Sequence, residues 1–327
     1  MSAEGGTKAV VAALLANVGI AVMKFAAWAL TGAASMLAEA VHSLADAGNQ
    51  ALLLVGGKRS QREATEEHPF GFGRERYIYA FIVAIVLFSL GGLFALYEAY
   101  HKWHEIHDGD GGGLLDSNFT WVPLVVLGAA IVMESLSFRT AIVEANKVRG
   151  DHGWIAFIRR AKAPELPVIL LEDFAALVGL TVALASVSLA LLTQNEYFDV
   201  VGAATIGVLL VVVAITLAIE VKSLLIGEAA SKESIARIRS AVEGTAGVSQ
   251  IIHMKTLHIA PDELLVALKI GVERHVPAEE SSAIIDAIEV NIREREPMAT
   301  QIYVEPDIYR PDYVPAERSE PPSASSH

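Results

Sequence analysis

The chain has 327 residues, of which 53% are hydrophobic, and its formal charge at pH 7 is −13. This apolar share excludes an ordinary soluble domain of the same length, and the negative charge argues against nucleic-acid binding. The chain has no cysteine, which excludes disulfides and thiolate metal sites, so a transition-metal ligand must be His, Asp, Glu or a neutral oxygen.

Six apolar segments follow one another over the first two thirds of the chain, each close to or above the ~20 residues of a membrane-spanning helix. The first lacks the short apolar core and small-residue cleavage site of a secretory signal, so we expect a retained helix. The sequence therefore predicts an α-helical membrane protein with six transmembrane helices. The segments are residues 9–30, 34–57, 77–100, 121–144, 167–192 and 198–225.

Lysine and arginine gather in two connections between these segments, around residues 58–76 and 147–162, whereas Lys102 is the only one in loop 101–119. Positively charged loops stay in the cytoplasm. We therefore expect both basic connections and, with six spans, both termini on the cytoplasmic side. The expected location is a bacterial inner membrane.

A mixed pattern follows the sixth segment and predicts a small soluble domain. A helix capped by Ser231 precedes a strand near 249–258 and the alternating stretch "ELLVALKIGVE" at 263–273. A helix opened by Pro277 and a short strand "TQIYVEP" come next. The order helix, strand, strand, helix, strand predicts a small α+β sandwich.

These patterns divide the chain into three parts. Residues 1–226 form the expected transmembrane domain and residues 227–310 the soluble domain. Residues 311–327 are rich in Pro, Ser and Glu, which is typical of a disordered tail.

The second apolar segment contains the polar residues Glu39, His42, Asp46 and Asn49. Their spacings of three and four place them on one face of a helix. One ionisable side chain near the bilayer centre costs about 2.5 to 3.5 kcal/mol, so this stripe requires compensation. His42 and Asp46 are one turn apart and can supply half of a tetrahedral site for a divalent metal such as zinc.

The fifth segment offers the remaining ligands, because Glu172 and Asp173 interrupt an apolar run that has no other charge. The alternative is that these groups only join helices or line a packing defect. Histidine, aspartate and an acidic pair on two segments favour metal binding, since buried charges need partners.

Several stretches together resemble the cation diffusion facilitator family over nearly the whole chain. They are "SMLAEAVHSLADAGNQ" (35–50), "HPFGFGRERY" (68–77), the acidic fifth segment and "IYVEP" (302–306). The resemblance implies a six-span transporter that works as a homodimer and carries a cytoplasmic α+β, ferredoxin-like domain. Residues 134–150 and 159–180 resemble a zinc-transporter branch whose animal members include a mitochondrial exporter.

The resemblance also implies a ligand set for the metal. His42 and Asp46 match the second-span ligands, and Asp173 matches the fifth-span aspartate. Zinc-transporting members usually have histidine four residues before that aspartate, where this chain has Ile169. Glu172 is the natural substitute, but adjacent helical residues point about 100° apart, so we rank Asp173 above Glu172.

Two further metal sites of the family are not expected. The loop site would need ligands at Thr65 and Phe72, which leaves His68 alone. Gly271 and Tyr303 occupy positions where some members carry histidine in the soluble domain. We therefore expect a dimerising domain without bound zinc.

Lys24 and Glu134 lie within the first and fourth segments and are expected to pair with each other or with Glu39. A structural or proton-path role is favoured over metal contact, because a charged lysine cannot ligate. A cluster in the loop after the third segment is expected to be solvated rather than to hold metal. Its members are His101, His104, His107 and Asp108.

The sequence thus predicts a proton-coupled exporter that moves Zn²⁺ out of the cytoplasm in exchange for H⁺. The expected partners are divalent cations, protons, the lipid bilayer and a second copy of the chain, with no nucleic acid and no cofactor besides the transported Zn²⁺. Alternatives are a Mn²⁺, Fe²⁺ or Co²⁺ transporter of the same fold and a non-transporting membrane metal sensor or scaffold. An enzyme is disfavoured, because the loops show no nucleophile or motif that would use the metal.

Overall fold

The computed structural model describes residues 3–108, 114–116, 118–151 and 153–310. The described residues form two compact units that divide after Glu228, and the short stretch Ile259–Asp262 groups with the first unit. Each unit has a hydrophobic core of its own. The tail predicted at residues 311–327 lies outside the described residues.

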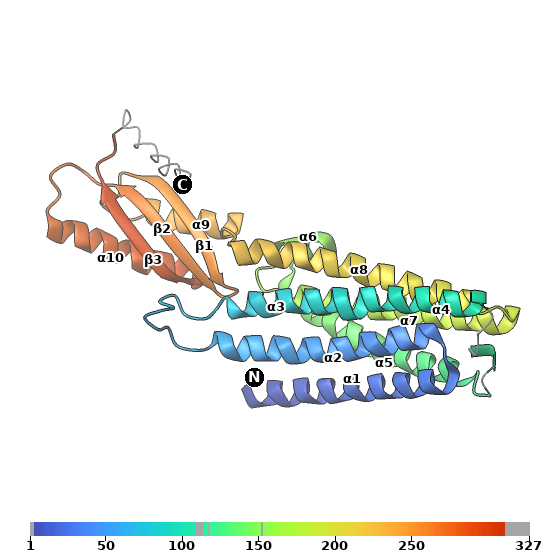
Figure 1. Cartoon of the computed structure of the whole chain (residues 1–327). Helices are drawn as coiled ribbons and strands as arrows, with labels where there is room; N and C mark the ends of the chain where they lie inside the picture. The colour runs from blue at the N-terminus through green and yellow to red at the C-terminus, as the bar shows by residue number, and fades with distance from the viewer. Residues whose placement is uncertain (1–2, 109–113, 117, 152, 311–327) are drawn as a thin grey trace, which may run out of the picture. The chain divides into compact units, whose positions relative to one another are not determined.

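Long helices lying side by side make up the first unit (Figure 1). Five of the six apolar segments fall within them, the third in a continuous helical stretch formed by α3, η1 and α4, and the fourth begins one residue before α5. The short elements η2 and α6 lie in the connections. The bounds are α1 (Ala3–Thr31), α2 (Ala34–Ser60), α3 (Glu75–Val86), η1 (Leu87–Leu93), α4 (Phe94–Asp108), η2 (Leu114–Asp116), α5 (Val122–Val148), α6 (Trp154–Arg160), α7 (Glu165–Thr193) and α8 (Tyr197–Ile226).

Among the described residues, four helical stretches are long and apolar enough to cross a membrane: Glu75–Asp108, Val122–Val148, Glu165–Thr193 and Tyr197–Ile226. The apolar part found in α1 is the shorter stretch Asn17–Thr31, and α2 is interrupted by its own polar residues. The chain is therefore a helical, multi-pass membrane protein. The number of six spans stays a prediction.

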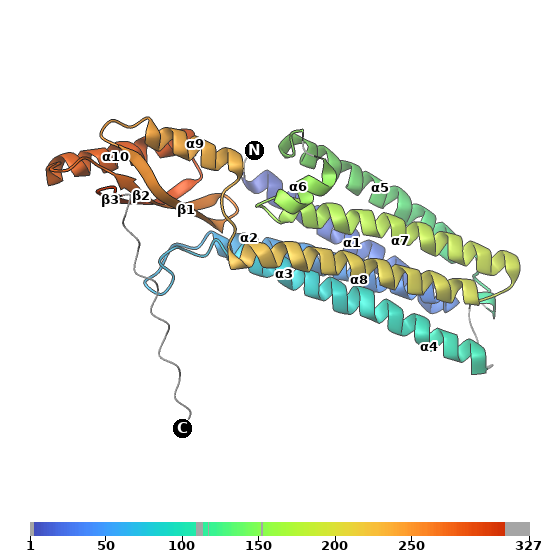
Figure 2. The same cartoon turned by 90° about the horizontal axis from the view of Figure 1, so that it is seen from above.

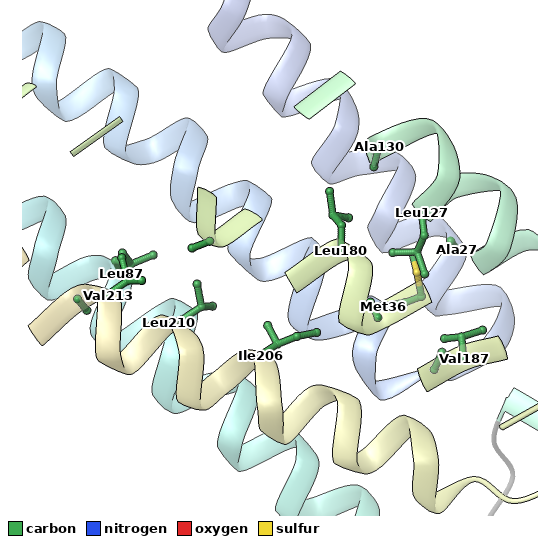
Figure 3. Close-up of a cluster of buried hydrophobic side chains, with 14 of the residues drawn as sticks. Ala27, Met36, Leu87, Leu127, Ala130, Leu180, Val187, Ile206, Leu210 and Val213 are labelled. Atoms are coloured by element: carbon green, nitrogen blue, oxygen red, sulfur yellow. The ribbon is translucent and has the colours of Figure 1, made fainter. Parts of the chain in front are cut away.

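Helix α2 lies inside the bundle, where it packs against α1, α3, α4, α7 and α8. Seen from above, α5 and α7 lie along one side of the bundle and the α3–α4 stretch along the other (Figure 2). Side chains from α1, α2, η1, α5, α7 and α8 meet in the core, among them Met36, Leu127 and Leu180, which have no exposed surface (Figure 3). Apolar packing on both sides thus encloses the polar face of α2.

Glycines let α8 approach the third helical stretch closely. A Cβ atom on Gly92 would lie 3.0 Å from the backbone nitrogen of Val211, and one on Gly207 would lie 3.0 Å from that of Leu96. Small residues at such contacts are typical of helix packing in membranes. This contact holds the α3–α4 stretch firmly against α8.

The second unit contains α9 (Lys232–Glu243), β1 (Gln250–Ala260), β2 (Glu263–Gly271), α10 (Ala278–Arg295) and β3 (Ala299–Asp307). This order confirms the predicted succession of helices and strands. Strand β2 is central, between β1 and β3, and it pairs with β3 in parallel. Both helices cover the same face of the sheet (Figures 1 and 2).

Alternation along β2 and the helical period of α10 build the core of this unit, as the sequence predicts. Ser231 caps α9, because its Oγ accepts a hydrogen bond from the Ser234 amide at 3.0 Å. Strand β2 ends at Gly271, so Val272, which belongs to the predicted stretch 263–273, lies beyond the strand and is only partly buried. The inward residues are Leu264, Val266, Leu268, Ile270, Ile284, Ile288 and Ile292.

Candidate metal centre

The polar stripe of α2 is enclosed by the bundle. Glu39 and Asn49 are fully buried, His42 is 1% exposed, and the Asp46 side chain is 14% exposed. Side chains of this kind avoid an apolar interior unless partners compensate them. The contacts of each one therefore indicate what the stripe is for.

His42 and Asp46 have side-chain atoms that could bind a metal and that make no hydrogen bond to the described residues. The His42 Nδ1 and Asp46 Oδ1 atoms are 3.5 Å apart. Both ring nitrogens of His42 and the Oδ1 atom of Asp46 are buried and have no hydrogen-bond partner among the described residues. Buried polar atoms are nearly always paired. An imidazole and a carboxylate with free ligand atoms one turn apart fit a divalent transition metal.

The two adjacent acids of α7 face different helices. The Glu172 Oε1 atom accepts a hydrogen bond of 2.7 Å from the Asn49 Nδ2 atom on α2, and Glu172 is 5% exposed. The Asp173 Oδ2 atom accepts a hydrogen bond of 3.0 Å from the Ser137 hydroxyl on α5. This difference follows from the ~100° turn between neighbouring helical residues. Glu172 is therefore the acid that contacts the polar helix.

Ile169, at the position where the resemblance implies histidine, is partly buried against an apolar cluster, as are Phe138 and Ile142 of α5. It thus faces the same helix as Asp173, which follows it by one turn. The α7 helix accordingly offers carboxylates but no imidazole at this level.

Three acidic groups from two helices act on Asp46. The carboxylates of Glu134 on α5 and of Glu172 and Asp173 on α7 interact electrostatically with it. Within the described ranges, however, no group of three or more His, Asp or Glu side chains lies close enough to hold one metal ion. The structure brings His42 and Asp46 together and does not bring either acid of α7 to them as a ligand. The four-residue site stays a prediction.

The sequence leaves open the partner of Lys24, and the structure shows that it is Glu39. The Lys24 Nζ atom donates hydrogen bonds of 2.9 Å to Glu39 Oε2 and 2.7 Å to the Ser43 hydroxyl. Lys24 is 1% exposed and Glu39 is fully buried. Removing one partner of a buried ion pair costs about 3–5 kcal/mol, so this pair fixes α1 to α2 beside the His42–Asp46 pair.

The second oxygen of Glu39 explains a glycine on α7. A Cβ atom on Gly179 would lie 2.6 Å from Glu39 Oε1, which is closer than two such atoms can approach. Gly179 and Glu172 are two turns apart, so they mark the face of α7 that packs against α2.

Ser137 and Asp199 are two polar partners that the sequence did not single out. Ser137 contacts Asp173, and Asp199 of α8 contacts the first residues of α2. Neither has a local signal, because each contact joins helices far apart in the chain. Asn49, by contrast, belongs to the predicted stripe.

His68, His101 and His104, which lie away from the polar stripe, contact aromatic or acidic neighbours. His68 is exposed and its ring lies 4.7 Å from that of Phe72. His101 pairs with Glu105 at 3.3 Å, and the His104 ring lies 4.3 Å from that of Tyr100. The structure corrects the predicted loop, because α4 continues to Asp108 and His101 and His104 therefore lie on a helix.

A helical membrane bundle with imidazole and carboxylate groups in its interior defines a class of cation-handling membrane proteins. Residues 10–226 match the cation efflux transmembrane domain, and residues 230–308 match the cytoplasmic domain of cation efflux proteins. The chain belongs to the cation efflux family, which confirms the resemblance to cation diffusion facilitators.

Named relatives are similar over most of this chain. The mitochondrial proton-coupled zinc antiporter SLC30A9 of Xenopus laevis is 32% identical over 257 residues, which are 78% of this chain and 44% of the relative. The human SLC30A9 protein is 30% identical over 77% of this chain and 43% of its own length. Metal tolerance protein C4 of Arabidopsis thaliana is 29% identical over 78% and 54%. The chain thus spans about half the length of these relatives or less.

The packing of Gly179 against Glu39 gives a first prediction. Gly179→Ala places a Cβ atom 2.6 Å from Glu39 Oε1 and should lower the thermal midpoint by several degrees, because overpacking costs about 1–3 kcal/mol. Gly128→Ala on α5 is the matched control, since its Cβ would meet no atom within 4 Å. Thermal unfolding of both variants in detergent tests this, and equal midpoints would contradict the packing.

A second prediction compares the two acids of α7. The ranking of Asp173 above Glu172 stays a prediction from sequence, whereas the Glu172–Asn49 contact favours the opposite order. On this geometry, Glu172→Gln should weaken zinc binding at least tenfold and more than Asp173→Asn, because it removes the carboxylate that faces α2. Calorimetric titration of both variants decides the order, and a larger loss in Asp173→Asn would uphold the ranking from sequence.

Proposed function

We propose that the chain is a proton-coupled exporter of divalent cations that moves Zn²⁺ out of the cytoplasm in exchange for H⁺. The observation that carries this proposal is the His42–Asp46 pair in the bundle, in which three possible ligand atoms have no hydrogen-bond partner among the described residues. A borderline metal such as Zn²⁺ suits this mixture of nitrogen and oxygen donors. The relatives named as proton-coupled zinc antiporters support the same substrate.

The other ligands in this proposal are Glu172 and Asp173. Glu172 already contacts Asn49, which lies one turn beyond Asp46 on the same face of α2. Binding would exchange that hydrogen bond for a bond to the metal and would join α7 to α2. Such an exchange couples the metal to the relative position of the two helices.

Charge balance supplies the reason for proton coupling. Asp46 interacts electrostatically with the carboxylates of Glu134, Glu172 and Asp173, and Lys24 is the one cation acting on it, already paired with Glu39. Unbalanced carboxylates are costly in an apolar interior, so a divalent cation or protons must neutralise them. Because metal ligands must be deprotonated, binding of the metal releases protons. Loading and release of the metal are therefore linked to proton exchange.

The apolar packing of Ile169 favours a second candidate within the same class. A site with one imidazole among carboxylates is harder than a site with two, and it would also accept Mn²⁺, Fe²⁺ or Co²⁺. A non-transporting sensor or scaffold is the remaining alternative. Uptake by the purified protein in liposomes separates all of these.

The proposed topology has six spans, with α1 and α2 crossing the membrane because they pack in the same bundle as the apolar helices. The basic connections support cytoplasmic termini. We propose that the C-terminal unit is a ferredoxin-like domain that joins two copies into a homodimer, in keeping with its match to the cytoplasmic domain of cation efflux proteins. A bacterial inner membrane stays a prediction, since two of the named relatives are mitochondrial.

The proposed ligand pair predicts that His42→Ala and Asp46→Ala each abolish Zn²⁺ uptake into proteoliposomes, because each removes a direct ligand of the metal. His253→Ala is the matched control, since His253 is exposed on β1 of the soluble unit, and it should transport at the parent rate. Comparing Zn²⁺, Mn²⁺, Fe²⁺ and Co²⁺ in the same assay identifies the substrate. Parent rates in either ligand variant would refute the site.

Proton exchange predicts a dependence on the pH gradient. Acid on the destination side should accelerate Zn²⁺ uptake several-fold, because protons compete there for the ligands and oppose rebinding of the metal. Uptake into vesicles with an acidic lumen is compared with uptake at equal pH on both sides. If collapsing the gradient with an ionophore leaves the rate unchanged, transport is not proton-coupled.

A further inference from the structure

The helix that carries the proposed metal ligands begins without a cap of its own. Its N-cap residue is Ala33, whose side chain cannot accept a hydrogen bond. The first amides of a helix have no partner within the helix, and Ala33, Ala34 and Ser35 are all fully buried. These amides need an acceptor from elsewhere in the bundle.

Asp199 of α8 is that acceptor. Its Oδ2 atom accepts a hydrogen bond of 2.6 Å from the Ala34 amide, and its Oδ1 atom accepts one of 3.3 Å from the Ser35 amide. The Ser35 hydroxyl also donates to Asp199 Oδ1. The carboxylate is 2% exposed and lies at the positive end of the α2 dipole, where a negative charge is favourable. One side chain of α8 thus takes over the cap of α2.

Three helices pack closely around this contact. Small side chains of α2, α4 and α8 form one buried cluster around it, and small residues let helix backbones approach closely. The junction fixes the N-terminal end of α2 against α8. Its members are Ala34, Ala38, Ala95, Ala99, Val200 and Ala203.

We propose that Asp199 is a positioning residue for transport. It ties the start of α2 to α8, so that α2, with its His42–Asp46 pair, moves together with α8 as one body. His42 lies seven residues beyond Ser35, or about 11 Å along the helix axis at 1.5 Å per residue. A shift at the start of α2 is therefore passed on to the ligands. This inference rests on the proposed function, but the tie itself can be measured without transport.

Asp199 could act only by capping α2, or it could also act by joining α2 to α8. The two roles predict different results when α2 is given a cap of its own. Asp199→Ala removes both and should lower the thermal midpoint and slow Zn²⁺ uptake at least tenfold. Adding Ala33→Ser gives α2 a capping hydroxyl of its own, because an N-cap serine accepts from the amides two or three residues on. The double variant should recover the midpoint but not the uptake rate. Recovery of both would show that Asp199 is only a cap and would overturn the proposal.

A second measurement tests the tie directly. The chain has no cysteine, so Leu44→Cys on α2 and Val208→Cys on α8, which are 53% and 54% exposed, accept spin labels without background. Pulsed electron resonance should give a narrow distance distribution with Asp199 present. The distribution should be broad in Asp199→Ala and in the double variant, and Asp199→Asn, which keeps an acceptor oxygen, should stay close to the parent.

The two measurements also separate this inference from the proposed function. An unchanged distribution in Asp199→Ala and in the double variant overturns the tie, whatever the uptake rates are. A broadened distribution in a protein whose parent form moves no metal supports the tie and refutes the exporter.

Discussion

Burial of charge inside an apolar helix bundle is the constraint on which the rest of this structure depends. Helix α2 carries the polar stripe, and its neighbours α1 and α7 each supply a partner for one of its polar groups. Lys24 of α1 pairs with Glu39, and Glu172 of α7 accepts a hydrogen bond from Asn49. The free ligand atoms of His42 and Asp46 lie between these contacts along the helix. His42 is the one residue of this stripe whose side-chain polar atoms all lack a hydrogen-bond partner among the described residues, whereas Glu39 and Asn49 each keep one unbonded oxygen.

The two adjacent acids of α7 connect α7 to two different helices. Glu172 connects it to α2 through Asn49, and Asp173 connects it to α5 through Ser137. A metal held between α2 and α7 would strengthen the contact of α7 with α2 relative to its contact with α5. Alternating access needs such an exchange of contacts around a central site. The π-helical η1 lies in the α3–α4 stretch, on the other side of the bundle from α5 and α7 (Figure 2), and glycines there let η1 and α4 pack closely against α8.

The C-terminal unit folds by simpler rules. Alternation along β2 and the helical period of α10 place every second or every fourth side chain in one core. Local turn and cap signals such as Ser231 and Pro277 set the element ends. Its hydrophobic core is separate from that of the bundle. Because local signals set its elements, their order could be predicted from the sequence.

The sequence by itself determined the helices of the bundle, the order of elements in the C-terminal unit and the polar stripe of α2, because these follow from hydropathy and from periods of 3.6 and 2 residues. Only the tertiary structure decided which groups meet. It paired Lys24 with Glu39 rather than Glu134, turned Glu172 and not Asp173 toward α2, and placed Asp199 at the start of a helix 165 residues earlier. Periodicity fixes the face a side chain occupies on its own helix, whereas its partner depends on which helices pack together and at what depth.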